Sequence, residues 1–251
     1  MHNELGIIAY APDLVDNDER PLAIVRAMER TFPGLRLEWT FSDEGQIVPL
    51  PQRDVWVNQR TEERPGPPLI CNGRDDGDMV TLWGSRTPAL IAPGGMDQAD
   101  FHVDLPHNAA GVAAAPAVLE AVAEAARAYW GECTPFDAAV DIARQTQNLP
   151  AKLEPPPRGL PVLKGPRFLH SPEIPQCLGW LCYWSAASAR IIGFPDPARD
   201  AELLSRARRT ASSGWVVQLT DEPLDLDRPD HLDALKRAYE RFPEIGGRSA
   251  R

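Results

Sequence analysis

Cysteine and lysine are both scarce in this sequence, with four and three residues of 251. The cysteines lack the close pairs or spaced histidines of a zinc site, and the chain begins without the basic residue and apolar run of a secretion signal. No stretch approaches the roughly 20 apolar residues that a membrane crossing needs. We therefore expect reduced thiols, no bound metal or cofactor, and a soluble cytoplasmic protein.

The signatures of common enzyme classes are also missing. No GxSxG, Walker A, GxGxxG, HExxH or paired CxxC motif occurs. The letters HxxE at residues 170–173 enclose Pro172, which prevents the helix that a metal-binding version requires. The acidic run at 75–78 lacks the glutamate of a calcium-binding loop, so a polar turn is favoured. We predict no catalytic or metal-ligating residue.

Negative charge is concentrated in the first half of the chain. Residues 1–130 contain 20 acidic and 10 basic side chains, whereas the remainder contains 16 of each. Such a surface repels nucleic acid and anionic lipid and attracts basic proteins, although many proteins are acidic for solubility alone. If the asymmetry serves a partner, the candidate residues are Asp13, Asp16, Asp18, Glu19, Asp75, Asp76 and Asp78.

The first half predicts alternating strands and helices. Continuous or alternating apolar residues predict strands, which we place at residues 5–10, 35–41, 69–71, 79–83 and 101–105. The last three are joined by turns rich in Gly, Pro and Asp, which indicates an antiparallel meander. Apolar stripes and alanine-rich segments predict helices, which we place at residues 22–32, 109–130 and 136–145. Residues 51–63 are predicted as a helix, although Val55-Trp56-Val57 would suit a strand equally well.

A proline-rich connector divides the chain. Residues 149–166 contain six prolines, which cannot propagate a helix or a central strand. We predict an acidic half, residues 1–148, joined by this connector to an aromatic and helical half, residues 167–245, although the two could form one continuous domain. The expected fold class is α+β, with helices packed on a mixed or antiparallel sheet.

Residues 178–184 form the most aromatic stretch of the chain. In either a helix or a strand, Trp180 and Trp184 share a face. The stretch is therefore either a packed core or a hot spot for a protein partner, with Trp180, Tyr183 and Trp184 as the contacting residues.

The chain closes with a strand at 214–220, an acidic turn and a helix at 229–242. Asp227 precedes this helix and is expected to cap it, and a further helix that carries Leu203, Leu204 and Ala207 is expected after Asp196. The turn contains Asp221, Glu222 and Asp225, which form either a solvated connection or a surface that recognises a basic partner.

Two sequence blocks resemble the immunity protein 52 family. Residues 179–183, GWLCY, resemble its GW-x-x-Y element, and residues 214–225 with 227–231 resemble its closing strand, TDEPFD-type turn and helix entry. Arg228 stands where the family pattern has Asn, and Trp184 where a smaller residue is usual. The whole chain is also similar to a related full-length group known only as a domain of unknown function.

The resemblance implies a cytoplasmic α+β antitoxin that binds and neutralises a cognate toxin domain of a contact-dependent or polymorphic toxin system. The expected partner is a basic toxin protein, with no role for nucleic acid or membrane. Two alternatives stay open. One is a small hydrolase or transferase with a dispersed site, such as His102, Asp104 and His107 at one strand end. The other is a module that scaffolds other proteins.

Overall fold

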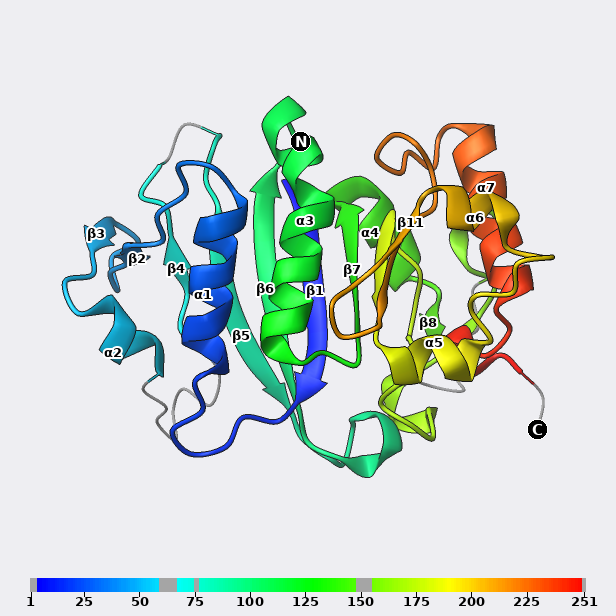
Figure 1. The fold of residues 1–251 in the computed structure, drawn as a ribbon, viewed down its shortest axis with the longest axis horizontal. Coiled ribbons are helices and arrows are strands. Elements are labelled where there is room, and N and C mark those ends of the chain that lie inside the picture. The colour runs from blue at the N-terminus through cyan, green and yellow to red at the C-terminus, as the bar shows by residue number, and fades with distance from the viewer. Residues whose placement is uncertain (1–3, 59–66, 75–76, 148–154, 250–251) are drawn as a thin grey trace.

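An antiparallel sheet of ten strands crosses the whole molecule in the computed structural model, which describes residues 4–58, 67–74, 77–147 and 155–249 (Figure 1). In order across the sheet the strands are β11 (Ala207–Arg209), β12 (Trp215–Gln218), β10 (Leu181–Trp184), β7 (Trp130–Pro135), β1 (Glu4–Pro12), β6 (Gln98–Pro106), β5 (Thr81–Thr87), β4 (Ile70–Cys71), β2 (Trp39–Phe41) and β3 (Ile47–Pro49). Two short strands, β8 (Thr146–Gln147) and β9 (Leu163–Lys164), pair in parallel beside it.

Strand β1 lies in the middle of this sheet because its alternate residues are strongly apolar. Leu5, Ile7 and Ala9 are completely buried, while the residues between them are half-buried on the opposite face. The strand pairs along its full length with β6 and also with β7, both antiparallel. The apolar run predicted as a strand is therefore confirmed, and its period of two places most of its buried area on one face.

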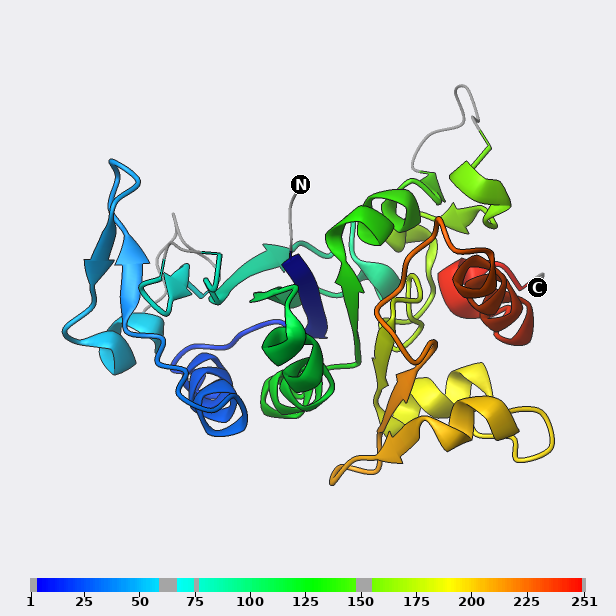
Figure 2. The same ribbon diagram turned by 90° about the horizontal axis from the view of Figure 1, so that it is seen from above.

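Helices α1 (Arg20–Thr31) and α3 (Ala109–Ala126) lie side by side on that face of the sheet (Figure 2). Small side chains let α3 pack closely, and Asn108 caps it by accepting a hydrogen bond from the Gly111 amide at 2.9 Å. Among the described residues, α3 is long and apolar enough to span a membrane, contrary to our expectation that no such segment exists. Its contacts with α1, β1 and β6 are those of a core helix.

The remaining helices lie around the sheet. They are α2 (Arg53–Asn58), α4 (Phe136–Ala143), α5 (Ala186–Ile192), α6 (Ala201–Ser205) and α7 (Pro229–Arg241). Helix α7 covers the face opposite to α3, where Phe242 at its end packs edge-on against Trp184, with ring centroids 5.3 Å apart. The α+β fold and the meander of β4, β5 and β6 agree with the prediction.

Some predicted boundaries in the first half are wrong. Residues 53–58 are helical, and 59–63 lie outside the described residues. The helix predicted at 109–130 ends at Ala126 because Arg127 adopts a left-handed conformation, with φ of 55°. Residues 130–135 instead form β7, whose six residues are all buried and therefore show no alternation.

Boundaries in the second half also need correction. The aromatic stretch is extended and forms β10. The helix expected after Asp196 is only the five residues of α6, and strand β11 follows it. Asp227 does not cap α7: Arg228 is the N-cap residue and makes no side-chain capping bond, while the Asp227 carboxylate lies 2.8 Å from Arg158.

The sheet continues across the proline-rich connector. Strand β10, which follows the connector, pairs directly with β7, which precedes it. Residues 149–154 of the connector lie outside the described residues, and the part that follows contains a 3-10 turn at Pro157–Gly159 and strand β9. Both halves of the chain therefore contribute neighbouring strands to one sheet.

Candidate protein-interaction site

The aromatic residues predicted as a partner hot spot are buried. Trp180 and Tyr183 are each 2% exposed, and Trp184 is completely buried. Trp184 packs against Phe194 and Phe242, with ring centroids 5.1 and 5.3 Å away. The interpretation as core packing is therefore correct for these side chains, and they do not form a contact surface.

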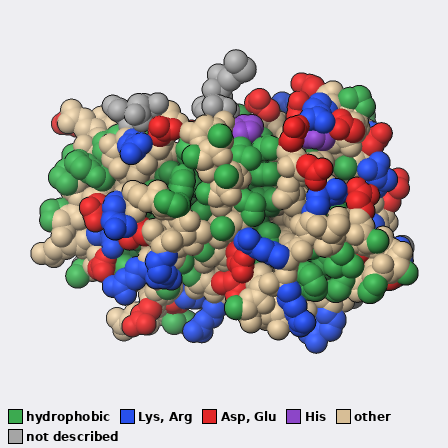
Figure 3. Space-filling model, turned by 45° about the horizontal axis from the view of Figure 1, so that its top comes forward, with side chains coloured by type: hydrophobic (Ala, Val, Ile, Leu, Met, Phe, Trp, Pro, Cys, Tyr) green, Lys and Arg blue, Asp and Glu red, His purple; other side chains and the backbone are tan. Residues whose placement is uncertain are grey.

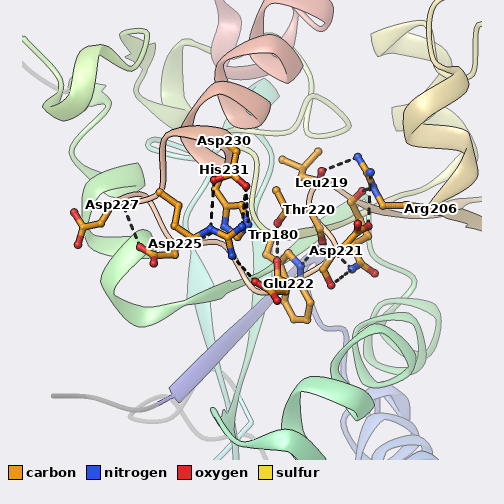
Figure 4. Close-up of polar contacts among 12 residues, drawn as sticks. Trp180, Arg206, Leu219, Thr220, Asp221, Glu222, Asp225, Asp227, Asp230 and His231 are labelled. Atoms are coloured by element: carbon orange, nitrogen blue, oxygen red, sulfur yellow. Dashed lines mark hydrogen bonds and ion pairs between the residues drawn. The ribbon is translucent and has the colours of Figure 1, made fainter.

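Trp180 instead supports the acidic turn, which we define as residues 219–228 between β12 and α7. Its indole Nε1 donates to the backbone carbonyl of Thr220 at 3.0 Å (Figure 4). The Gln218 side chain donates to the carbonyls of Thr220 and Asp221, at 2.8 and 3.0 Å, and the Thr220 hydroxyl donates to the carbonyl of Glu222 at 2.6 Å. The first part of the turn is thus held by the buried Trp180, by Gln218 at the end of β12 and by the turn's own Thr220.

His231 fixes the second part of the acidic turn from the start of α7. Its ring is 4% exposed, and its Nδ1 accepts a hydrogen bond of 3.1 Å from the Asp225 backbone amide. The Asp225 carboxylate in turn accepts from the Asp227 amide at 2.9 Å. The backbone is therefore ordered from both sides, while the carboxylates of Asp221, Glu222 and Asp225 are exposed to solvent.

Three arginines lie against carboxylates of the acidic turn. Arg206 donates to the Leu219 carbonyl at 2.9 Å and lies 3.7 Å from the Asp221 carboxylate. Arg228 bridges Glu222 and Asp230, and the latter contact lowers the pKa of the Asp230 carboxyl. Arg158, from the connector, lies 2.8 Å from Asp227. The carboxylate partners Asp221, Glu222, Asp227 and Asp230 are each at least 65% exposed, so these ion pairs are weak.

A pocket of about 400 Å³ opens beside the turn. Its polar lining consists of Asp137, Asp141, Asp225, Asp227, Arg158 and His107. Figure 3, in which the upper end of the sheet faces forward, shows acidic and basic side chains mixed over this right-hand part of the molecule. The arrangement is suited to binding cationic side chains of another protein.

The residues of the enzyme alternative do not converge. His102 stacks on Trp83 with ring centroids 3.8 Å apart, and burial lowers its pKa to about 4. Asp104 accepts a hydrogen bond from the Thr81 hydroxyl at 2.7 Å. His107 lines the pocket beside the acidic turn, and the other two do not. Within the described part of the chain, no group of three or more His, Cys, Asp or Glu residues could hold a metal ion.

The other predicted acids lie elsewhere. Asp13 pairs with Arg86 at 2.9 Å and Asp18 with Arg20 at 2.7 Å, at the opposite end of the sheet from the acidic turn. Asp16 and Glu19 are exposed in the same loop. Asp78 accepts a hydrogen bond from Asn108 at 2.8 Å, and Asp75 and Asp76 lie outside the described residues. The predicted acids therefore do not form one surface.

Sequence reasoning missed the basic residues and the histidine of the site. Arg228 and His231 lie inside the second motif block, so their positions could have indicated a role. Arg158 and Arg206 reach the turn from distant parts of the chain, and no sequence pattern links them to it.

The blocks that carry the family resemblance thus meet at one place in the structure. Trp180 comes from the first block, and Thr220, Asp225 and His231 come from the second. A family model described as Domain of unknown function (DUF5953) matches residues 16–250. The chain belongs to this family.

The chain is also similar to a solved structure, the Pseudomonas aeruginosa T6SS protein PA0821. The two share 14% sequence identity and superpose with a TM-score of 0.57, over 95% of this chain and 76% of that chain. At this identity the similarity shows a common fold. No curated protein matches this member of the DUF5953 family.

Proposed function

We propose that this protein is an immunity protein, which binds a cognate toxin domain of a polymorphic toxin system in the cytoplasm and neutralises it. The acidic turn is the contact site in this proposal, and the partner is a basic protein. Binding needs complementary surfaces and no chemical step on this chain.

One observation carries the proposal: the two blocks similar to the immunity protein 52 family meet at a single, ordered acidic turn, which belongs to the second block and accepts a hydrogen bond from Trp180 of the first. The bonds from Trp180 and to His231 fix the backbone before any partner arrives. A preformed surface loses less conformational entropy on binding than a loop that must first become ordered. The solved structure with a similar fold is named as a T6SS protein.

The charges of the turn fit a basic partner. Asp221, Glu222 and Asp225 are exposed, and the net charge of the chain is −10. Long-range attraction of this kind raises association rates, and partner arginines could replace the internal ones at the exposed carboxylates. The same charge disfavours nucleic acid and anionic membranes as partners.

Co-expression tests this function directly. A candidate toxin domain taken from a gene adjacent to this one is expressed in a bacterial host with and without the full-length chain, and an inactivated toxin serves as the control for expression burden. We expect the chain to restore growth and to co-purify with the toxin. A complex that forms without restoring growth would indicate a scaffold, and turnover of a substrate by the purified chain would indicate an enzyme.

A further inference from the structure

Apolar side chains are exposed at the tip of the β5–β6 hairpin. Leu90 is 87% exposed, Ile91 49% and Met96 47%. Val15, in the loop between β1 and α1 at the same end of the sheet, is 66% exposed (Figure 1). A single exposed leucine is ordinary, but four such residues in two linked loops indicate an interaction site. We call these two loops, residues 13–19 and 88–97, the hairpin-tip surface.

The hairpin tip is held in place by hydrogen bonds on several sides. The Ala89 amide donates to the Asp97 carboxylate at 2.5 Å, which closes the loop at its base. The Ile91 amide donates to the Pro88 carbonyl at 3.0 Å, and the Gly94 amide donates to the Leu169 carbonyl at 2.8 Å. The apolar side chains are therefore presented on an ordered backbone, as in a binding surface that needs little rearrangement.

Arg86 joins the two loops. Its guanidinium lies between two carboxylates, 2.9 Å from Asp13 and 2.5 Å from Asp97. Asp16 and Glu19 add exposed carboxylates to the first loop. Arg20 pairs with Asp18 in the same loop. The two loops therefore carry five carboxylates against the two guanidinium groups of Arg86 and Arg20, and the rim has a net negative charge.

We propose that the hairpin-tip surface docks a second protein, whose own surface has an apolar recess surrounded by basic residues. Leu90 and its neighbours fill the recess, and Asp13, Asp16 and Asp97 face the basic rim. Apolar anchors supply most of the binding energy in such interfaces, and rim charges supply rate and specificity.

The negative charge of the hairpin-tip surface favours a basic protein over a second copy of the chain and over an anionic membrane. A second copy of the chain would place the acidic rims against each other in a symmetric interface, which like charges oppose. An anionic membrane would be repelled by the same carboxylates. A basic protein with an apolar recess can both bury the apolar side chains of the tip and pair with the carboxylates of its rim.

This surface is separate from the acidic turn and does not depend on the proposed toxin function. The hairpin tip lies at the lower end of the sheet in Figure 1, and the acidic turn follows β12 at the upper end. A nine-residue strand such as β6 spans about 30 Å, so the two sites are too far apart to share one small interface.

Site-specific crosslinking tests the proposal. A photoreactive amino acid replaces Leu90 in the full-length chain in its native cells, and Val55, 56% exposed on α2, is the matched control position. Any captured protein is identified, purified and tested for binding at low and high salt. We expect a basic protein to be captured from position 90 and not from position 55. The double variant Leu90→Asp with Met96→Asp should bind this protein at least tenfold more weakly, and Val55→Asp should bind it as the wild type does.

Several results would overturn the proposal: capture of no protein at position 90, capture of only a second copy or an acidic protein, or equal binding by the wild type and the double variant. Circular dichroism checks that the variants remain folded, and Leu90→Ala with Met96→Ala replaces the aspartate pair if they do not. If the chain fails to protect cells from the toxin but a basic protein still binds the hairpin-tip surface, the result counts against the proposed function and not against this proposal.

Discussion

The indole nitrogen of Trp180 lies 3.0 Å from the backbone carbonyl oxygen of Thr220, so a buried residue directly before β10 positions the acidic turn. Trp180 is 2% exposed, whereas the neighbouring Asp221 and Glu222 are exposed. The tryptophan and the acidic turn therefore act together: one is fixed in the core, and the other presents charge at the surface.

Replacing Trp180 with phenylalanine should destabilise the protein modestly. The change removes the N–H donor and leaves space, but the Thr220 carbonyl keeps its bond from Gln218. We expect a loss of about 1–2 kcal/mol in the free energy of unfolding, measured by urea denaturation. Trp39→Phe, at a 36% exposed position on strand β2, which lies next to the edge strand β3, is the control and should change it by less than about 0.5 kcal/mol. Equal stability of the two variants would show that the indole bond contributes nothing.

Gly179, the first residue of the same motif, is required by space. A methyl group there would collide with the side chains of Glu132 and Thr134 and would lie 3.0 Å from the Cys133 carbonyl oxygen. Gly179→Ala should therefore lower the free energy of unfolding by about 1–3 kcal/mol. Gly6→Ala is the matched control, because a methyl group there would lie an ordinary 3.8 Å from its nearest neighbour, the Thr134 carbonyl oxygen. A similar small effect at both positions would contradict this explanation.

The fold class could be predicted from the sequence because local patterns carry it. The continuous apolar run of β1 and the turns of the meander are short-range signals. Strand β7 has no such local pattern. Its six residues are all buried, and the alanine-rich sequence of α3 runs directly into it, so the sequence predicts a single longer helix there. The stretch that became β10 was ambiguous because a fully buried run gives no period that separates a helix from a strand.

The sequence predicts the acidic turn as a charged segment, but it does not predict which side chains surround the turn. Arg206 and Arg158 reach it from outside the segment, and such contacts have no sequence pattern. The exposed tip at Leu90 was also missed, since an apolar residue in a loop is read as core until the fold places it outside. The sequence therefore predicts where charge lies along the chain but not which charges share a surface.

Charge at the acidic turn should affect the rate of toxin association. Replacing Glu222 with Gln and Asp225 with Asn removes two exposed charges, and the same change at Asp43 and Glu44, exposed between β2 and β3, is the control. We expect the first pair to lower the association rate severalfold at low salt and much less at high salt. Stopped-flow binding measures it. Equal effects of the two pairs would indicate that only net charge matters and that the turn is not the contact site.

The carboxyl group of Glu132 should make stability depend on pH. It is buried on β7 and accepts a hydrogen bond from the Thr134 hydroxyl. Burial raises its pKa from 4.5 to about 7. Between these values the unfolded chain has released the proton while the folded chain retains it, so the free energy of unfolding falls as pH rises and levels off above about 7.

Glu132→Gln should remove this dependence, because the amide is neutral at every pH and has nearly the same shape. Between pH 4 and pH 8 the wild type should lose on the order of 3 kcal/mol more than this variant, measured by urea denaturation. Glu124 provides a control of opposite sign: burial opposes its ionisation, but hydrogen bonds from Ser212 and Tyr183 outweigh this and lower its pKa. Its contribution is lost as pH falls, so Glu124→Gln should weaken the protein most at neutral pH. Parallel pH profiles for the wild type and Glu132→Gln would show that the buried carboxyl group is not the cause.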